Sequence, residues 1–68
     1  MSAHMIEAGV AIRMLETAGY IAKRSAGGRR LHVYSGDPSE PGTWMEIAVT
    51  MISPDDFVSR HALRDCLP

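Results

Sequence analysis

The chain of 68 residues is poor in cysteine, in long apolar runs and in excess charge, and each shortage excludes a class of protein. Its single cysteine, Cys66, excludes an internal disulfide framework and favours a reducing, cytoplasmic location. The longest apolar run near the N-terminus, Val10–Ile12, is too short for a signal peptide or a membrane span. The pI near 6.2 lacks the strongly basic balance of many nucleic-acid binders. The composition therefore predicts a soluble domain that does not associate with membranes.

The length predicts a single domain over residues 1–68, with room for only a modest core. The dipeptide His4-Met5 fits a cloning junction, so we interpret residues 1–4 as a tag remnant or a disordered end. Charge is distributed unevenly along the chain. Residues 13–34 hold five of the seven basic residues and one acid, about +4 in total, while the remainder is about −5. An anion-binding surface is therefore expected in this window.

The first half of the chain predicts a helix followed by a β-hairpin. Small and apolar residues recur at helical spacing over Met5–Ala18, and Gly19 is suited to end the helix with a positive φ. Tyr20–Arg24 and Arg29–Ser35 have the composition of strands, on either side of the loop Ser25–Gly28.

The second half predicts a loop, a strand and a second helix. Gly36–Thr43 is rich in turn residues, and its prolines cannot donate to a sheet ladder. Trp44–Ile52 alternates in the manner of a half-buried strand. Ser53 as N-cap, proline at the first helical position and two acids in the first turn predict a helix over Pro54–Asp65. Its apolar residues are spread around the helical wheel and define no buried face: Phe57, Val58, Ala62, Leu63 and Cys66.

Together these elements predict an α+β domain in the order α-β-β-β-α, a two-layer fold in which a three-stranded antiparallel sheet packs against two helices. The alternation places Met45 and Met51 on the same strand face as two β-branched residues. The side chains expected to point inward are Leu31, Val33, Ile47 and Val49. A marginal core and an open sheet edge also favour a homodimer.

The basic hairpin carries the main functional prediction, which is contact with DNA or RNA. Arginine and lysine side chains grip phosphates, and tyrosine offers a stacking surface for bases. The candidate nucleic-acid-binding residues are Lys23, Arg24, Arg29, Arg30, His32 and Tyr34. The same charges also fit a solvated hairpin that keeps a strand edge soluble. The sequence alone leaves both interpretations open.

The remaining residues offer little chemistry. Asp55 and Asp56 are explained by helix capping, and Trp44 fits either a protein interface or the closure of one end of the core. Neither a metal nor a cofactor is predicted, since the side chains that most often bind metals lack a recognised spacing: His4, His32, His61 and Cys66.

Two protein families share parts of this pattern. The segment Ala11–Tyr34, ending LETAGYIAKRSAGGRRLHVY, resembles the recognition helix and basic wing of winged-helix transcription regulators. The order α-β-β-β-α resembles that of HicA-type toxins, and so does the start of the chain, where a helix is followed by a glycine, an aromatic residue and a strand. These toxins are small ribonucleases with a fold like that of double-stranded-RNA-binding domains. In that family a Gly-Ser-His turn supplies the catalytic histidine, whereas the turn here is Gly27–Arg30. The resemblance implies His32, the nearest histidine, as the catalytic residue.

Three functions follow as hypotheses. The first is a non-enzymatic regulatory or accessory module that contacts nucleic acid through Lys23–Arg30. The second is a phage- or mobile-element-like factor that binds a larger protein through Trp44 and the second helix. The third is a HicA-like ribonuclease that uses His32. Binding ranks above catalysis because no nucleophile, base and orienting group stand at a recognisable spacing.

Overall fold

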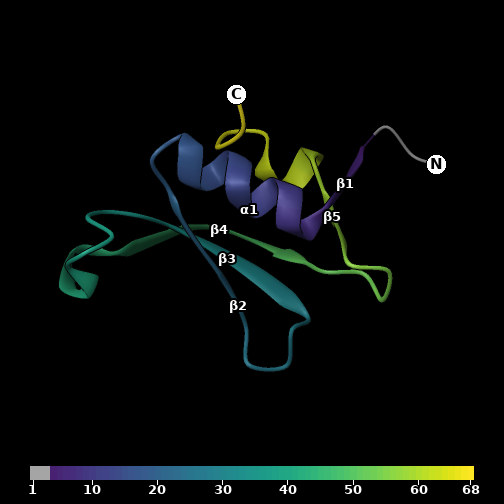
Figure 1. Cartoon of the computed structure of the whole chain (residues 1–68), viewed down its shortest axis with the longest axis horizontal. Coiled ribbons are helices and arrows are strands. Elements are labelled where there is room, and N and C mark those ends of the chain that lie inside the picture. The colour runs from purple at the N-terminus through teal and green to yellow at the C-terminus, as the bar shows by residue number, and fades with distance from the viewer. Residues whose placement is uncertain (1–3) are drawn as a thin grey trace.

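A computed structural model describes residues 4–68 as an α+β domain with one α-helix and two antiparallel sheets (Figure 1). The elements are β1 (Met5–Glu7), α1 (Ala8–Thr17), β2 (Ile21–Arg24), β3 (Arg30–Ser35), η1 (Pro41–Thr43), β4 (Met45–Met51), β5 (Phe57–Ser59) and η2 (His61–Leu63), where η marks a 3₁₀ turn. The interpretation of residues 1–3 lies outside the described residues. His4 is part of the fold, because its backbone oxygen accepts a hydrogen bond from the Arg60 amide at 2.6 Å.

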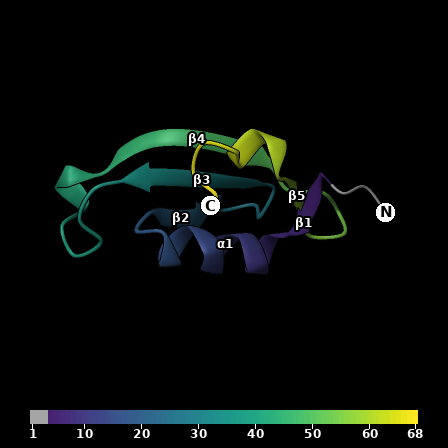
Figure 2. The ribbon, with the colours of Figure 1, turned by 90° about the horizontal axis from the view of Figure 1, so that it is seen from above.

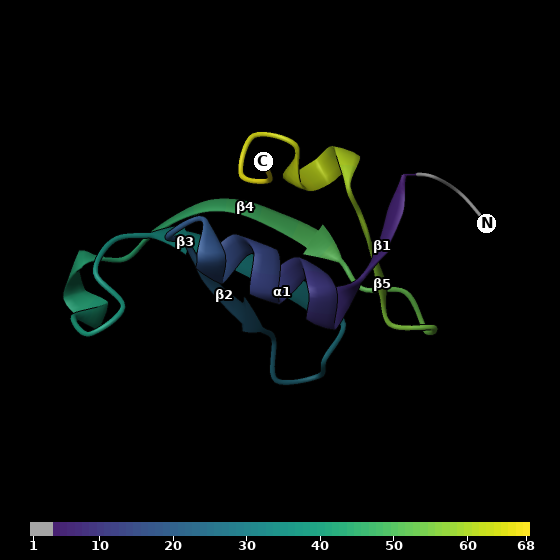
Figure 3. The same ribbon diagram turned by 45° about the horizontal axis from the view of Figure 1, so that its top comes forward.

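The larger sheet has the strand order β2-β3-β4, and Figure 2 shows these strands side by side. Helix α1 and the C-terminal turn η2 lie over one face of it, as Figures 1 and 3 show. The core between these layers contains five fully buried large side chains: Leu15, Leu31, Leu63, Val33 and Val58. We call the opposite side of the sheet the outer face.

Helix α1 ends as predicted, and it begins three residues later than predicted. Gly19 has a φ of 96°, and the amides of Gly19 and Tyr20 donate to the carbonyl oxygens of Glu16 and Leu15, which is a Schellman motif. Met5–Glu7, predicted as the first helical turn, instead forms β1. These residues pair with β5, so the backbone groups that would begin a helix are used in a ladder.

The hairpin of β2 and β3 confirms the prediction for this part of the chain. The strands pair antiparallel, with Ile21 opposite Tyr34 and Lys23 opposite His32. Gly28 has a φ of 70°, which glycine adopts without strain, and its amide donates to the Ser25 carbonyl at 2.8 Å. The predicted inward position of the β3 side chains is also confirmed, since Leu31 and Val33 are fully buried.

Strand β4 forms where it was predicted, but its orientation was predicted wrongly. Ile47 and Val49 were expected to point inward, yet they are 43% and 48% exposed. The register explains why: Thr50 lies opposite Leu31, and Ala48 lies opposite the buried Val33. These smaller residues face inward because β4 packs against the C-terminal turn η2, whose buried leucine occupies the space above the strand. The pairing with β3 and the contact with that turn thus accompany the burial of the smaller side chains of β4.

The predicted second helix over Pro54–Asp65 is wrong, so the two-helix, α-β-β-β-α arrangement is also wrong. Ser53 closes a tight turn: its amide donates to the Phe57 carbonyl at 2.8 Å, and its hydroxyl accepts from the Phe57 amide at 3.0 Å. Asp56 occupies the left-handed region, with a φ of 69°. The serine and acids that resembled a helix cap therefore build a turn that leads into β5. This strand buries Val58 opposite Ile6 of β1, a pairing that depends on residues distant in sequence.

Candidate nucleic-acid interface

The outer face gathers most of the side chains predicted to contact nucleic acid. Alternation along β3 directs Arg30, His32 and Tyr34 away from the buried side chains between them. Lys23 of β2 lies directly opposite His32, so it joins the same face from the neighbouring strand. Arg29 lies in the hairpin turn, directly before β3. Cations and rings from separate parts of the hairpin thus share one surface.

The aromatic side chains of this face form a continuous row. The rings of His32 and Tyr34 stack at a centroid distance of 6.4 Å with 14° between their planes. Tyr34 and Trp44 follow at 5.7 Å and 33°. The Lys23 ammonium lies 5.7 Å from the centroid of the Trp44 ring, within the range of a cation–π interaction. The row therefore places flat apolar surfaces beside positive charge.

Trp44 also anchors the loop that follows β3. Its indole N–H donates to the Asp37 carbonyl at 2.7 Å, and Trp44 lines a hollow together with Pro38 and Ile21. Ile21 is only 5% exposed, although it lies outside the main core cluster. Trp44 thus closes a small second apolar cluster on the outer face. Its use as a protein interface stays a prediction.

His32 is held by an acid that sequence patterns did not associate with it. Its Nδ1 lies 2.5 Å from the Glu46 carboxylate, a diagonal contact between β3 and β4. A β-bulge between Val33 and Tyr34 shifts the register and pairs Tyr34 with Glu46. The carboxylate orients the imidazole and partly neutralises the face at this point. Loop lengths alone could not have predicted this register.

The basic end of the outer face is hollowed beside the hairpin turn. The residues lining this hollow are Ser25, Gly27, Arg29, Arg30, His32 and Met51. The Ser25 hydroxyl accepts a hydrogen bond from the Arg30 amide at 3.2 Å, which fixes the backbone where the arginines emerge. A concave surface lined by two arginines suits an anionic group such as phosphate.

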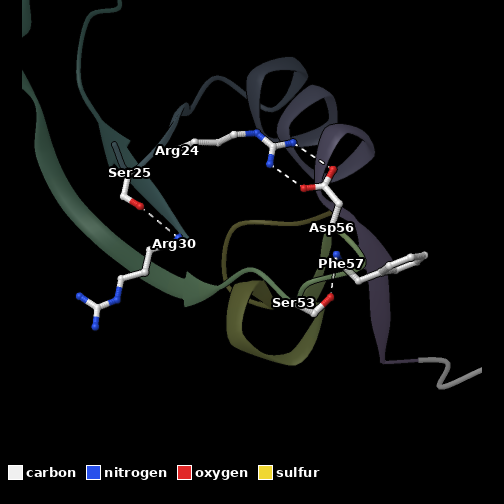
Figure 4. Close-up of polar contacts among 6 residues, drawn as sticks. All are labelled: Arg24, Ser25, Arg30, Ser53, Asp56 and Phe57. Atoms are coloured by element: carbon white, nitrogen blue, oxygen red, sulfur yellow. Dashed lines mark hydrogen bonds and ion pairs between the residues drawn. The ribbon is translucent and has the colours of Figure 1, made fainter. Parts of the chain in front are cut away.

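Arg24 is the one predicted residue that the fold removes from this surface. Figure 4 shows its guanidinium forked onto the Asp56 carboxylate while Arg30 extends in another direction. The two nitrogen–oxygen distances are 2.7 and 3.2 Å. These hydrogen bonds hold the pKa of the Asp56 carboxyl below its usual range and raise the pKa of Arg24. The pair ties β2 to the turn before β5, which is a structural role.

The Arg24–Asp56 pair predicts a specific acid sensitivity. A carboxyl whose pKa is lowered by folding stabilises the fold above its unfolded pKa, and that contribution is lost as the pH falls through the folded pKa. Asp56→Asn keeps a residue that tolerates a positive φ and removes the charge. We expect wild type to exceed Asp56→Asn in unfolding free energy near neutral pH, with the difference shrinking once the pH falls below the unfolded pKa of aspartate, about 3.9, and vanishing below the lowered pKa of Asp56.

Urea unfolding followed by circular dichroism at several pH values measures this difference. The neighbouring Asp55→Asn is the matched control, because it removes an adjacent carboxylate and leaves the Arg24–Asp56 pair in place. A gap between wild type and Asp56→Asn that is constant across the acid range would contradict the assignment.

The other candidate chemistry gains no support from side-chain placement. Within residues 4–68, no three or more His, Cys, Asp or Glu side chains gather as a metal site would require. Cys66 is buried, and burial raises the pKa of its thiol, which lowers its reactivity. None of the helices in this part of the chain has the length and apolarity needed to cross a membrane.

Strand β4 supplies a surface that the sequence did not predict. Its exposed apolar side chains, which we call the apolar strip, are Met45, Ile47, Val49 and Met51. The β-bulge pairs Met45 with Ser35, so Met45 lies outside the alternation of the other three. Val49 and Met51 lie opposite His32 and Arg30, so the strip borders the basic and aromatic residues. The alternation of these residues was visible in the sequence, but it predicted that their side chains face the core.

No family model matches the chain, and neither the curated proteins nor the solved structures gave a match. The resemblance to winged-helix regulators therefore stays a prediction, and the resemblance to HicA-type toxins stays one without the α-β-β-β-α order, which the fold does not have.

Proposed function

We propose that this chain is a binding module for single-stranded nucleic acid, and that the outer face of the sheet is its contact surface. The observation that carries the proposal is the row Arg30, His32 and Tyr34 on one face of β3, with Lys23 beside it. Bases of a single strand can stack on flat rings, while guanidinium and ammonium groups neutralise the phosphates between them.

The arrangement favours a single strand over a duplex. Aromatic side chains on a sheet can stack only with bases that are already unpaired. Helix α1, the one α-helix in residues 4–68, has Ala8, Ala11 and Leu15 buried against the sheet. Its position leaves the sheet surface as the better candidate.

Ribonuclease activity has weaker support than binding. Cleavage by attack of a ribose 2′-hydroxyl uses a base and an acid on opposite sides of the phosphorus. His32 and Glu46 are bonded directly to each other, so together they act as one proton-transfer unit. Intact RNA in a binding experiment would agree with this ranking.

The binding proposal predicts different salt dependences for two arginines of the same hairpin. Arg30→Ala removes a phosphate contact, and we expect the slope of log affinity against log salt to fall by about 0.7, the value for one contact to a single strand. Arg24→Ala is the matched control, because the Arg24 guanidinium is bonded to Asp56. Its slope should equal that of wild type. Fluorescence anisotropy of a labelled single-stranded oligonucleotide measures both.

Equal slopes for Arg30→Ala and wild type would remove Arg30 from the interface. Loss of binding in Arg24→Ala, with the fold intact by circular dichroism, would show that the surface is misassigned.

A further inference from the structure

A hollow lies at the free edge of the larger sheet, where the aromatic row ends. Its lining includes Trp44, the last ring of the row, and Lys23 beside it, together with Glu16 from the end of α1. Strand β2 is the edge strand here, since the strand order is β2-β3-β4. The hollow has a volume of about 240 Å³. It is smaller than the roughly 300 to 1,000 Å³ of a site for a drug-sized ligand, so it suits a single planar ring system.

One wall of the hollow is aromatic and continuous with the proposed contact surface. The Trp44 ring lies 5.7 Å from the Tyr34 ring, and the hydrogen bond from its indole N–H to the Asp37 carbonyl holds it in place. Bases that stack in succession on Tyr34 and Trp44 therefore reach the hollow without leaving the outer face. Lys23 supplies the charge that neutralises the phosphate of a nucleotide bound there.

The backbone of β2 presents a hydrogen-bond donor and an acceptor at this edge. The Ser25 amide donates to the Arg30 carbonyl at 2.9 Å, so these two residues form a hydrogen-bonded pair of the ladder. Such pairs alternate with non-hydrogen-bonded pairs along an antiparallel ladder, which makes Ala22 and Val33 a non-hydrogen-bonded pair. The N–H and C=O of Ala22 therefore point away from β3, and Ala22 lines the hollow. Groups of this kind hydrogen-bond to the Watson–Crick edge of an unpaired base.

Glu16 adds a carboxylate to the lining. Its side chain is exposed, and within the part of the chain that the structure describes its carboxylate forms no ion pair. A carboxylate accepts hydrogen bonds and donates none, so it selects a base edge with neighbouring N–H donors. Among the four bases of RNA, guanine alone has two adjacent donors on its Watson–Crick edge, N1–H and the N2 amino group. Glu16 therefore favours guanine over the other three bases.

We propose that the hollow is a guanine-selective base pocket. The base stacks on Trp44, the Glu16 carboxylate accepts hydrogen bonds from N1–H and the N2 amino group, and the Ala22 N–H donates to O6. This inference rests on the proposed binding of a single strand by the outer face, and it adds a base preference to that binding. The other contacts of the face are to phosphates and to the flat surfaces of bases, which carry little sequence information.

Fluorescence anisotropy with labelled RNA tests the preference. The probes are an oligouridine and the same oligonucleotide with one central guanosine, inosine or adenosine. Inosine keeps the N1–H and O6 of guanosine and lacks the N2 amino group. Wild type should bind the guanosine probe at least roughly tenfold more tightly than the adenosine probe, with the inosine probe between them, because hydrogen bonds to a charged group are strong.

Glu16→Gln should bind the guanosine and adenosine probes with affinities within about twofold of each other. Glu7→Gln is the matched control, because it removes the same charge at the opposite end of α1, and it should keep the wild-type ratio. Free guanosine monophosphate should compete only weakly, since it cannot stack along the row.

The outcomes separate the pocket from the binding surface. Salt-dependent binding by wild type with equal affinities for the guanosine and adenosine probes would overturn the pocket and leave the outer face as a nucleic-acid interface. A guanosine preference that survives in Glu16→Gln would also overturn the pocket. Guanosine monophosphate that competes as well as the unlabelled oligonucleotide would overturn the assignment of the hollow to a strand. No binding of any probe at low salt would overturn the pocket and the proposed function together.

Discussion

Truncating two valines in neighbouring strands is expected to destabilise the fold by very different amounts. Val33→Ala should lower the free energy of unfolding by about 2 to 3 kcal/mol, because Val33 is fully buried against the core. Val49→Ala should cost less than about 1 kcal/mol, since Val49 is about half exposed. A domain of this size has a total stability of roughly 5 kcal/mol, so the first change is large.

Both variants lose the same atoms from a β-strand, so their difference reports burial and not strand propensity. Urea unfolding measures this difference in free energy. A low protein concentration keeps self-association from adding to the stability. If Val49→Ala were the more damaging change, β4 would face the core as its sequence pattern suggests, and the outer face would have a different composition.

Replacing Gly36 should be the most damaging change in a loop. Gly36 has a φ of 127°, and a Cβ built there would lie 2.6 Å from the Thr43 carbonyl oxygen. We expect Gly36→Ala to cost at least about 2 kcal/mol, because both the backbone strain and the contact must be relieved. The loop between β3 and β4 holds Trp44 against Tyr34, so the near-ultraviolet circular dichroism of Trp44 should change with it.

Gly27→Ala is the matched control for this change. Gly27 lies in the hairpin turn without a positive φ, and a Cβ there has no atom within 4 Å. Its stability should stay within about 1 kcal/mol of wild type. Equal effects of the two substitutions would mean that the loop from Gly36 does not close on Thr43.

The elements that the sequence predicted correctly are those specified by local chemistry. The helix end at Gly19 depends on one residue that accepts a positive φ, and the hairpin depends on a glycine turn between β-forming segments. Alternation located β4 to within a residue or two. Each of these signals acts over a few neighbouring residues.

The elements predicted wrongly depend on contacts between distant segments. The Ser53–Asp56 sequence suits a helix start and a tight turn equally well, and only the pairing of β5 with β1 selects the turn. The orientation of β4 is set by η2, which follows it by about ten residues. A strand with apolar residues on one face normally buries them, so the pattern gave no warning of an exposed strip.

The sequence predicted the candidate site only in part, because the site also depends on contacts between distant segments. The hairpin basic residues were visible as a charge cluster, but their separation into Arg24 on one side and Arg30 on the other requires the strand register. The acid partners Asp56 and Glu46 lie far along the chain from Arg24 and His32. Side-chain pairing across such distances has no local signature.

An amide NMR titration of the labelled protein with a short single-stranded RNA, at low and near-physiological salt, tests the binding surface most directly. We predict salt-sensitive shifts confined to Lys23, Arg29–Tyr34 and the Trp44 indole, with the amide signals of helix α1 unchanged. Shifts on α1 alone, or no shift at either salt concentration, would contradict the assignment of the outer face as a nucleic-acid interface.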